Sequence, residues 1–143
     1  MKRVEDYDYH WGITLRIYPD TKAKQIIFNN GGCSRFIYNR LVAIQQEIYN
    51  LKKVGIYIDT VAERLEYLQS IYCNAAGLKN AIPFLNGKLI DSYMIDNAIK
   101  DYKAAWNMYF KNPATNIPTF HKKDSTYSYK TCNLFIMWSC YER

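Results

Sequence analysis

The sequence has few of the side chains that build metal or disulfide sites. Four cysteines and two histidines are spread along it: Cys33, Cys73, Cys132, Cys140, His10 and His121. No two cysteines form a C-x-x-C pair, and the histidines are far from the cysteines in sequence. Because a tetrahedral zinc site usually draws pairs of ligands from short loops, we expect no zinc site. Free thiols in a reducing compartment are the default expectation.

The chain also lacks the short motifs of common catalytic centres. It contains no G-x-x-x-x-G-K, H-E-x-x-H or G-x-S-x-G pattern. Asp91, Asp96 and Asp101 recur at five-residue steps. At about 100° per residue, this spacing spreads them around a helix instead of converging them on a metal ion. We therefore expect no catalytic residue, metal, cofactor or enzymatic activity in this chain.

Long apolar runs and a secretion signal are absent as well. No stretch of about 20 apolar residues occurs, so no membrane span and no membrane partner are expected. The N-terminus, MKRVEDYDYHWG, mixes charges and has no apolar core of a signal peptide. We expect a cytoplasmic protein.

What the sequence does contain is enough apolar material for a folded core, together with positive charge. It is 49% hydrophobic and 22% charged, with a net charge of +6. The charge is uneven: +5 over residues 16–53, −2 over 54–99 and +4 over 100–143. Two basic blocks that flank an acidic one favour a polyanionic partner. Ordinary solvated helix faces would explain the same pattern.

Alternating apolar residues predict β-structure near both ends of the chain. Residues 12–18 alternate between apolar and polar positions and predict a half-buried strand that ends at Pro19. Residues 126–131 alternate again, and the apolar run at 133–140 predicts a buried strand. The first and last strands are expected to pair, with the helices inserted between them.

The middle of the chain predicts helices. Gly31 and Gly32 are expected to break the first helical stretch, and Thr60 with Glu63 resembles a capping box. Asp91 or Ser92 is expected to cap the last long helix. The expected helices cover about 21–30, 33–53, 60–76 and 92–111, with a loop over 78–90. The second carries an apolar stripe at helical spacing: Ile37, Leu41, Ile44, Ile48 and Leu51.

Several short blocks resemble the N-terminal part of TnpB (OrfB) proteins, the RNA-guided DNA endonucleases that insertion sequences encode. The blocks follow one another in order from residue 11 to about residue 131. They are Arg16-Ile17-Tyr18-Pro19, Gly32-Cys33-Ser34-Arg35-Phe36-Ile37-Tyr38-Asn39, Ile90-Asp91-Ser92, Asn97-Ala98-Ile99-Lys100-Asp101-Tyr102, Ala105-Trp106, Ile117-Pro118-Thr119-Phe120-His121-Lys122-Lys123 and Ser128-Tyr129-Lys130-Thr131. After Thr131 the resemblance fades.

The resemblance implies an α+β fold, in which a recognition lobe of about four helices is inserted into a small antiparallel β-barrel, the wedge domain. Both a complete barrel and one that lacks some strands are compatible with the resemblance. The implied domains are a first wedge strand at 1–19, the helical lobe at 20–112, and a basic connector with return wedge strands at 113–143. The family's RuvC-like nuclease centre lies downstream of the matched blocks, so the chain is expected to be truncated before it.

The resemblance also implies partners: guide RNA, and double-stranded DNA beside the target. The expected role is therefore a DNA- and RNA-binding module of a transposable element, with a helix-turn-helix element and without cleavage of its own. Binding to DNA would associate the protein with the nucleoid.

Candidate contacts with nucleic acid lie in three parts of the sequence. The basic connector offers its cations to phosphates and one aromatic ring for stacking on a base. Arg16 lies on the first expected strand, and Arg35 with Asn39 shares a helix face. Near the start of the last helix, an acidic Asp96 would change the DNA motif that is read, because a carboxylate accepts from cytosine but repels phosphate. The candidates are Arg16, Arg35, Asn39, Ser92, Asp96, Lys100, Lys103, His121, Lys122, Lys123, Tyr129 and Lys130.

Plain structural roles compete with each of these assignments. Arg16 can pair with a carboxylate in the barrel, Asn39 can hold its helix to the wedge, and Asp96 can stabilise a helix N-terminus. The whole chain also has an alternative function. It can be a decayed transposon product or a protein-interaction fragment with no specific nucleic-acid role, which self-associates through an exposed strand edge.

Overall fold

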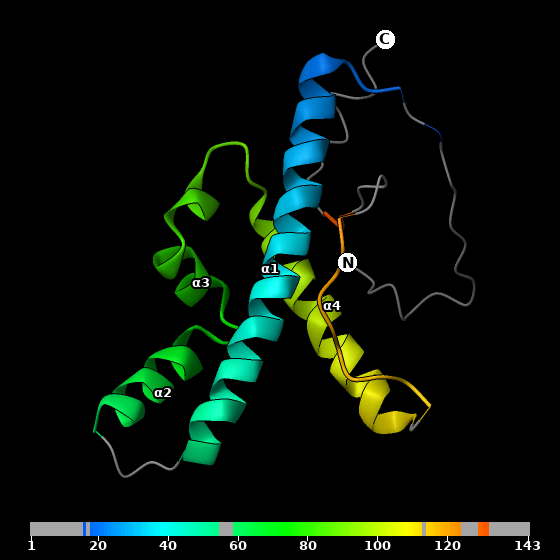
Figure 1. The fold of residues 1–143 in the computed structure, drawn as a ribbon. Helices are drawn as coiled ribbons and strands as arrows, with labels where there is room; N and C mark the ends of the chain where they lie inside the picture. Colours follow the sequence, from blue (N-terminus) through cyan, green and yellow to red (C-terminus); the bar gives the residue numbers. More distant parts are fainter. Residues whose placement is uncertain (1–15, 17, 55–58, 113, 124–128, 132–143) are drawn as a thin grey trace, which may run out of the picture.

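The structure, a computed structural model, is helical. It describes residues 16, 18–54, 59–112, 114–123 and 129–131. Its elements are α1 (Thr21–Val54), α2 (Asp59–Ile71), α3 (Ala75–Ala81), the short 3-10 helix η2 (Pro83–Asn86) and α4 (Ser92–Lys111). Figure 1 shows α1 as a long rod crossed by α4.

The expected α+β fold with a β-barrel is wrong, because the described ranges contain helices and no strand. Of the expected strand at 12–18, only Arg16 and Tyr18 are described, and neither is in a strand. Of the expected strand at 126–131, residues 129–131 are described and are extended without a β-ladder. Alternation alone does not make a strand, because a strand needs a partner for its backbone groups. The apolar run at 133–140 lies outside the described residues. The strand edge expected to mediate self-association belongs to this run and is likewise outside the described residues.

The predicted break at Gly31 and Gly32 is also wrong, since α1 runs unbroken from Thr21 to Val54. Each glycine weakens a helix by about 1 kcal/mol relative to alanine, which is a small penalty against the packing of nine turns. A Cβ added at Gly32 would meet no atom within 4 Å, so no close contact requires a glycine there. Asp20 precedes the helix, and its Oδ1 accepts a hydrogen bond of 2.7 Å from the amide of Ala23.

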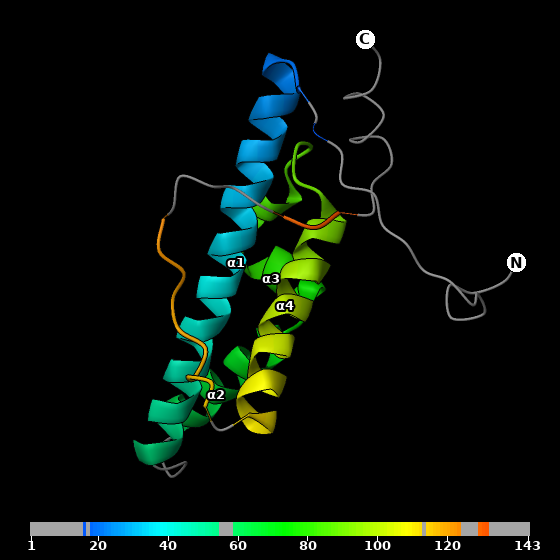
Figure 2. The ribbon, with the colours of Figure 1, turned by 90° about the vertical axis from the view of Figure 1, so that its right-hand side faces the viewer.

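The core lies between α1 and α4, with α2, α3 and η2 packed on one side of the pair. The segment at 114–123 and 129–131, which we call the connector, crosses the other side (Figures 1 and 2). The predicted stripe of α1 is confirmed: Ile37, Leu41, Ile44 and Ile48 are buried, and Leu51 packs against them. From α4, the buried residues are Met94, Ile95, Ala98, Ile99 and Tyr102. Packing of these apolar stripes therefore holds the two long helices together.

The bounds of the short helices differ from the prediction. α2 begins at Asp59, so Thr60 is inside the helix and is not its N-cap. It ends at Ile71, where Cys73 takes the left-handed backbone conformation with φ 55°. α3 spans the end of the helix expected at 60–76 and the beginning of the loop expected over 78–90. A Cβ at Gly77 would lie 2.9 Å from the Ser70 carbonyl oxygen, so this glycine permits the close approach of α3 to the end of α2.

A buried polar network joins three parts of the chain. The Asn30 side chain is fully buried on α1, and its Nδ2 donates to the carbonyls of Ile26 and Leu89, each at 2.9 Å. Its Oδ1 accepts from the amide of Asp91 at 2.8 Å. Asp91 is the N-cap of α4, as one of the two predicted alternatives, and accepts from the amide of Tyr93 at 3.0 Å. Its other carboxylate oxygen accepts a hydrogen bond from the Thr131 hydroxyl of the connector.

A cluster of tyrosines crosses the core and predicts a stability change at alkaline pH. The hydroxyls of Tyr72 and Tyr102 are 3.0 Å apart, and the ring of Tyr38 packs edge-on against that of Tyr102. Burial is the main cause that raises the pKa of all three side chains. Each hydroxyl is neutral in both states below pH 10, whereas above it the unfolded chain ionises first. The free energy of unfolding is therefore expected to fall as pH rises above about 10, by up to about 1.4 kcal/mol per pH unit for each tyrosine.

Urea unfolding at pH 8, 10 and 11 measures this fall. Tyr72→Phe is expected to make it shallower, whereas Tyr67→Phe, at an exposed position of α2, serves as the matched control. Equal slopes in the two variants would count against the tyrosine cluster as the cause.

Candidate nucleic-acid interface

Asn39 fastens the connector to α1. Its side chain makes a two-bond contact with the backbone of His121, 82 residues further along the chain. Nδ2 donates to the His121 carbonyl at 3.0 Å, and Oδ1 accepts from the His121 amide at 2.7 Å. The His121 ring stacks on Tyr38, with ring centroids 3.9 Å apart. We call this contact the Asn39–His121 clamp. It brings the two basic blocks of the sequence together, and it assigns Asn39 and the backbone of His121 a structural task.

α4 holds the other end of the connector. Asn97 Nδ2 donates to the Lys130 carbonyl at 3.0 Å, and Lys130 Nζ forms an ion pair of 2.5 Å with Asp101. Tyr129 is half-buried and packs against the core. Sequence reasoning assigned no role to Asn97, although its position in one of the resembling blocks beside the Lys100 candidate was a usable signal. The ion pair neutralises much of the Lys130 charge, so Lys130 contributes less positive field than its neighbours.

Lys122 and Lys123 follow the clamp directly, and both side chains are exposed. Arg35 lies one helical turn before Asn39 on the same face of α1 and is half-buried. The Asn39–His121 clamp thus puts two exposed cations close to the face of α1 that carries a third. We call Arg35, Lys122 and Lys123 the connector cations.

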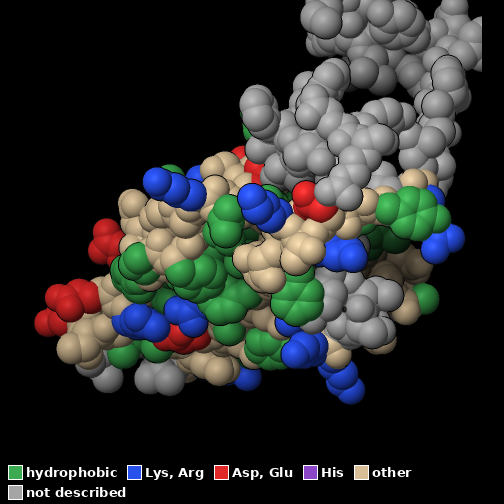
Figure 3. Space-filling model, turned by 90° about the horizontal axis from the view of Figure 1, so that it is seen from above, with side chains coloured by type: hydrophobic (Ala, Val, Ile, Leu, Met, Phe, Trp, Pro, Cys, Tyr) green, Lys and Arg blue, Asp and Glu red, His purple; other side chains and the backbone are tan. Residues whose placement is uncertain are grey.

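Acidic side chains gather elsewhere. Asp59, Glu63 and Glu66 are exposed on α2, on the side of α1 opposite the connector. Figure 3, seen from the N-terminal end of α1, shows Lys and Arg side chains interleaved with hydrophobic ones, and much of the acidic surface at one edge. The exposed acidic side chains of α2 therefore lie away from the connector.

The candidates on α4 form a separate group. Ser92, Asp96, Lys100 and Lys103 are exposed and follow one another at helical spacing. The Ser92 hydroxyl accepts from Lys79 Nζ of α3 at 2.9 Å. Lys103 is close enough to Cys73 to act electrostatically on that thiol, whose pKa burial raises and Lys103 lowers. This row faces α2 and α3, whereas the connector contacts the neighbouring row of Asn97 and Asp101.

Arg16 lies apart from both groups. It precedes the N-terminal end of α1, and its guanidinium lies over the ring of Tyr18, 5.2 Å from the ring centroid. Both side chains are exposed. The structure thus divides the sequence-predicted residues into the connector group, the α4 row and this isolated arginine.

Cys33 and Cys73 are free thiols, and burial raises the pKa of the Cys33 thiol. Among the described side chains, no group of three or more His, Cys, Asp or Glu is placed to hold a metal ion. No helix in the described ranges has the length and apolarity that a membrane crossing requires.

Comparison with known families identifies the first part of the chain. Residues 11–53 match the helix-turn-helix domain of OrfB proteins of IS605-type insertion sequences. No curated protein and no solved structure matches the chain. The match supports the predicted N-terminal region of OrfB/TnpB type and indicates a DNA-binding, transposon-related role. Within that span, residues 21–53 form nearly the whole of α1 and contain no turn.

Proposed function

We propose that this chain is the nucleic-acid-binding module of a TnpB-type RNA-guided DNA endonuclease and does not cut DNA by itself. The connector cations contact the sugar–phosphate backbone of guide RNA, and the α4 row lies against double-stranded DNA beside the target. The Asn39–His121 clamp carries the proposal, because it joins the connector to the helix in the OrfB-matched region. The proposal that the RNA partner is a guide RNA rests on the resemblance to the TnpB family.

Two physical arguments support this arrangement. The exposed lysines can bind phosphates and gain free energy from counterion release. Because the connector is held at both ends, this binding costs less backbone entropy than it would in a loop without such contacts. The two groups of candidates lie on different sides of α4, so RNA and DNA can be bound without competing for one surface.

The α4 row also predicts which DNA it would favour. Asp96 is exposed at the start of α4, where a carboxylate can accept from the amino group of cytosine but repels a phosphate. Its DNA preference would therefore differ from that of a protein with glutamine at this position, and selection from a randomised duplex would show the difference between the protein and Asp96→Gln.

The proposal is tested by the salt dependence of binding. The full chain is expected to bind a structured RNA and a DNA duplex with an affinity that falls steeply between 50 and 200 mM salt, with a log–log slope of about −2 to −4 for three or four neutralised phosphates. Fluorescence anisotropy at four salt concentrations measures this slope, with polyglutamate as a control polyanion. Absence of binding at 50 mM salt, or equal binding to polyglutamate, would refute the proposal.

A further inference from the structure

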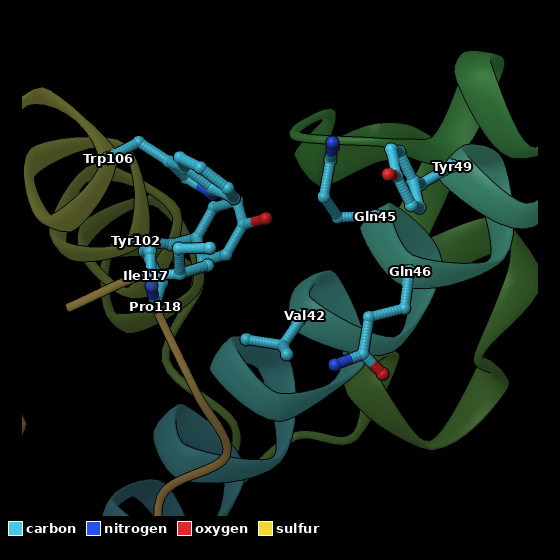
Figure 4. A pocket seen from close by; sticks show the side chains of 8 residues that line it. All are labelled: Val42, Gln45, Gln46, Tyr49, Tyr102, Trp106, Ile117 and Pro118. Atoms are coloured by element: carbon cyan, nitrogen blue, oxygen red, sulfur yellow. The ribbon is translucent and has the colours of Figure 1, made fainter. Parts of the chain in front are cut away.

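A cavity of about 410 Å³ opens between the C-terminal halves of α1 and α4, below the Asn39–His121 clamp. Figure 4 shows two facing walls, one from α1 and one from α4 with the connector. The α1 wall consists of Val42, Gln45, Gln46 and Tyr49, and the opposite wall of Tyr102, Trp106, Ile117 and Pro118. None of these eight residues is among the candidate nucleic-acid contacts predicted from the sequence.

The lining combines flat rings with amide groups. Trp106 and Tyr49 offer aromatic faces on opposite sides, and the side chains of Gln45 and Gln46 add donors and acceptors. The indole Nε1 of Trp106 is buried and has no hydrogen-bond partner among the described atoms. Because solvent does not reach this N–H and Tyr102 packs edge-on against the indole, a ligand in the cavity would contact the indole ring and not its N–H. An unpaired nucleobase has both the flat face and the polar edge that such a lining suits.

The position and charge of the cavity favour the same ligand. Gln46 lies two turns beyond Asn39 on one face of α1, about 10 Å along the helix. A nucleic-acid strand whose phosphates contact the connector cations can therefore place a base in the cavity. Lys53 Nζ lies 4.5 Å from the centroid of the Tyr49 ring, which puts a positive charge at the rim. An apolar protein side chain would use neither the amides of Gln45 and Gln46 nor the positive charge at the rim.

We infer that this cavity binds an unpaired nucleobase of a single-stranded RNA or DNA segment, stacked on Trp106 and hydrogen-bonded by Gln45 or Gln46. This inference rests on the proposed function and adds a base-binding site to its phosphate contacts. Stacking tolerates every base, so the site is expected to favour single strands over duplexes more than one base over another.

The indole N–H signal of Trp106 in a ¹⁵N correlation spectrum reports on the site directly. The full chain has three tryptophans, and Trp106→Phe assigns the signal. Titration with five-nucleotide probes rU, rA, dT and dA is expected to shift it, while an abasic pentamer with the same phosphates leaves it unchanged. The RNA and DNA probes distinguish the two sources of the base.

Variants separate stacking from hydrogen bonding. Trp106→Leu is expected to weaken pentamer binding about tenfold, through the loss of one stacked base. Trp106→Phe keeps a ring and is expected to lose less. Gln45→Ala with Gln46→Ala spares the aromatic packing and is expected to weaken binding about fivefold. Asn50→Ala, at an exposed position of α1, is the matched control.

Three results would overturn the inference. The first is an abasic pentamer that shifts the indole signal as strongly as the pentamers with bases do. The second is full pentamer affinity in both the Trp106→Leu and the Gln45→Ala/Gln46→Ala proteins. The third is an indole signal that moves with protein concentration alone, which would indicate a protein occupant. If these variants bind normally while Lys122→Ala/Lys123→Ala binds weakly, the base site fails and the proposed function stands. If no nucleic acid binds at all, both fail.

Discussion

Replacing Asn30 by alanine is expected to lower the free energy of unfolding by about 2–4 kcal/mol. The side chain makes three hydrogen bonds, and two of them join α1 to the segment that leads into α4. Without the Asn30 side chain, the Leu89 carbonyl and the Asp91 amide lose their partner, and the Asp91 amide does so at a buried position. Asp91 both caps α4 and accepts the hydrogen bond from Thr131 of the connector. Loss of the Asn30 hydrogen bond to Asp91 is therefore expected to loosen the connector as well.

Urea unfolding followed by circular dichroism measures the change, and Asn29→Ala is the matched control. Asn29 is half-buried on the same helix, and its Oδ1 accepts only a local bond from Gln25. Both substitutions gain the same helix propensity, so their difference isolates the bridge. The control is expected to change stability by less than about 0.5 kcal/mol. Similar values for the two variants would show that the buried bridge contributes little.

Removing Lys122 and Lys123 together is expected to weaken binding of structured RNA about tenfold or more at 0.1 M salt. Each lysine that neutralises a phosphate contributes about 0.9 to the log–log salt slope, so the slope should become shallower by nearly 2. Both side chains are exposed and the clamp holds the backbone of His121, so the fold should be unaffected.

A second double variant separates position from net charge. Lys88→Ala/Lys111→Ala removes the same charge from two exposed sites outside the connector and is expected to leave the slope nearly unchanged. Anisotropy titrations over a salt series compare the two variants. An equal loss of affinity in both would mean that only the total charge matters.

Local patterns in the sequence predicted the parts of the fold that local physics determines. The spacing of Ile37, Leu41 and Ile44 predicted the buried face of α1, and Asp91 was one of two predicted caps for α4. The expected last helix, at about 92–111, agrees with the bounds of α4, Ser92–Lys111. These features depend on side chains within a few residues of one another.

The predictions failed where distant contacts override local preference. Gly31 and Gly32 have a low helix propensity. The packing of α1 against α4 nevertheless stabilises a helix that is continuous across both glycines. The barrel was expected from alternation and from resemblance, neither of which states what a segment pairs with. Asn30, Asn39 and Asn97 bind backbone groups 59, 82 and 33 residues away, and no local pattern identifies such partners.

The candidate site was predicted as residues but not as an arrangement. The connector cations and the α4 row were predicted from charge and resemblance. In the structure, Ser92 of the α4 row bonds to α3, whereas the connector bonds to Asn97 of a neighbouring row. The cavity beside Trp106 was not anticipated, because it forms only when α1, α4 and the connector come together. An apolar stripe containing tryptophan predicts core packing equally well.

A double-mutant cycle on RNA affinity tests most directly whether the clamp positions the connector cations. The cycle compares Asn39→Ala, Lys122→Ala/Lys123→Ala and their combination, each confirmed as folded by circular dichroism. If the clamp places the lysines, Asn39→Ala alone should remove most of their contribution, and the combined variant should bind little worse than the lysine variant. Fully additive losses, or full RNA affinity in Asn39→Ala, would contradict the account.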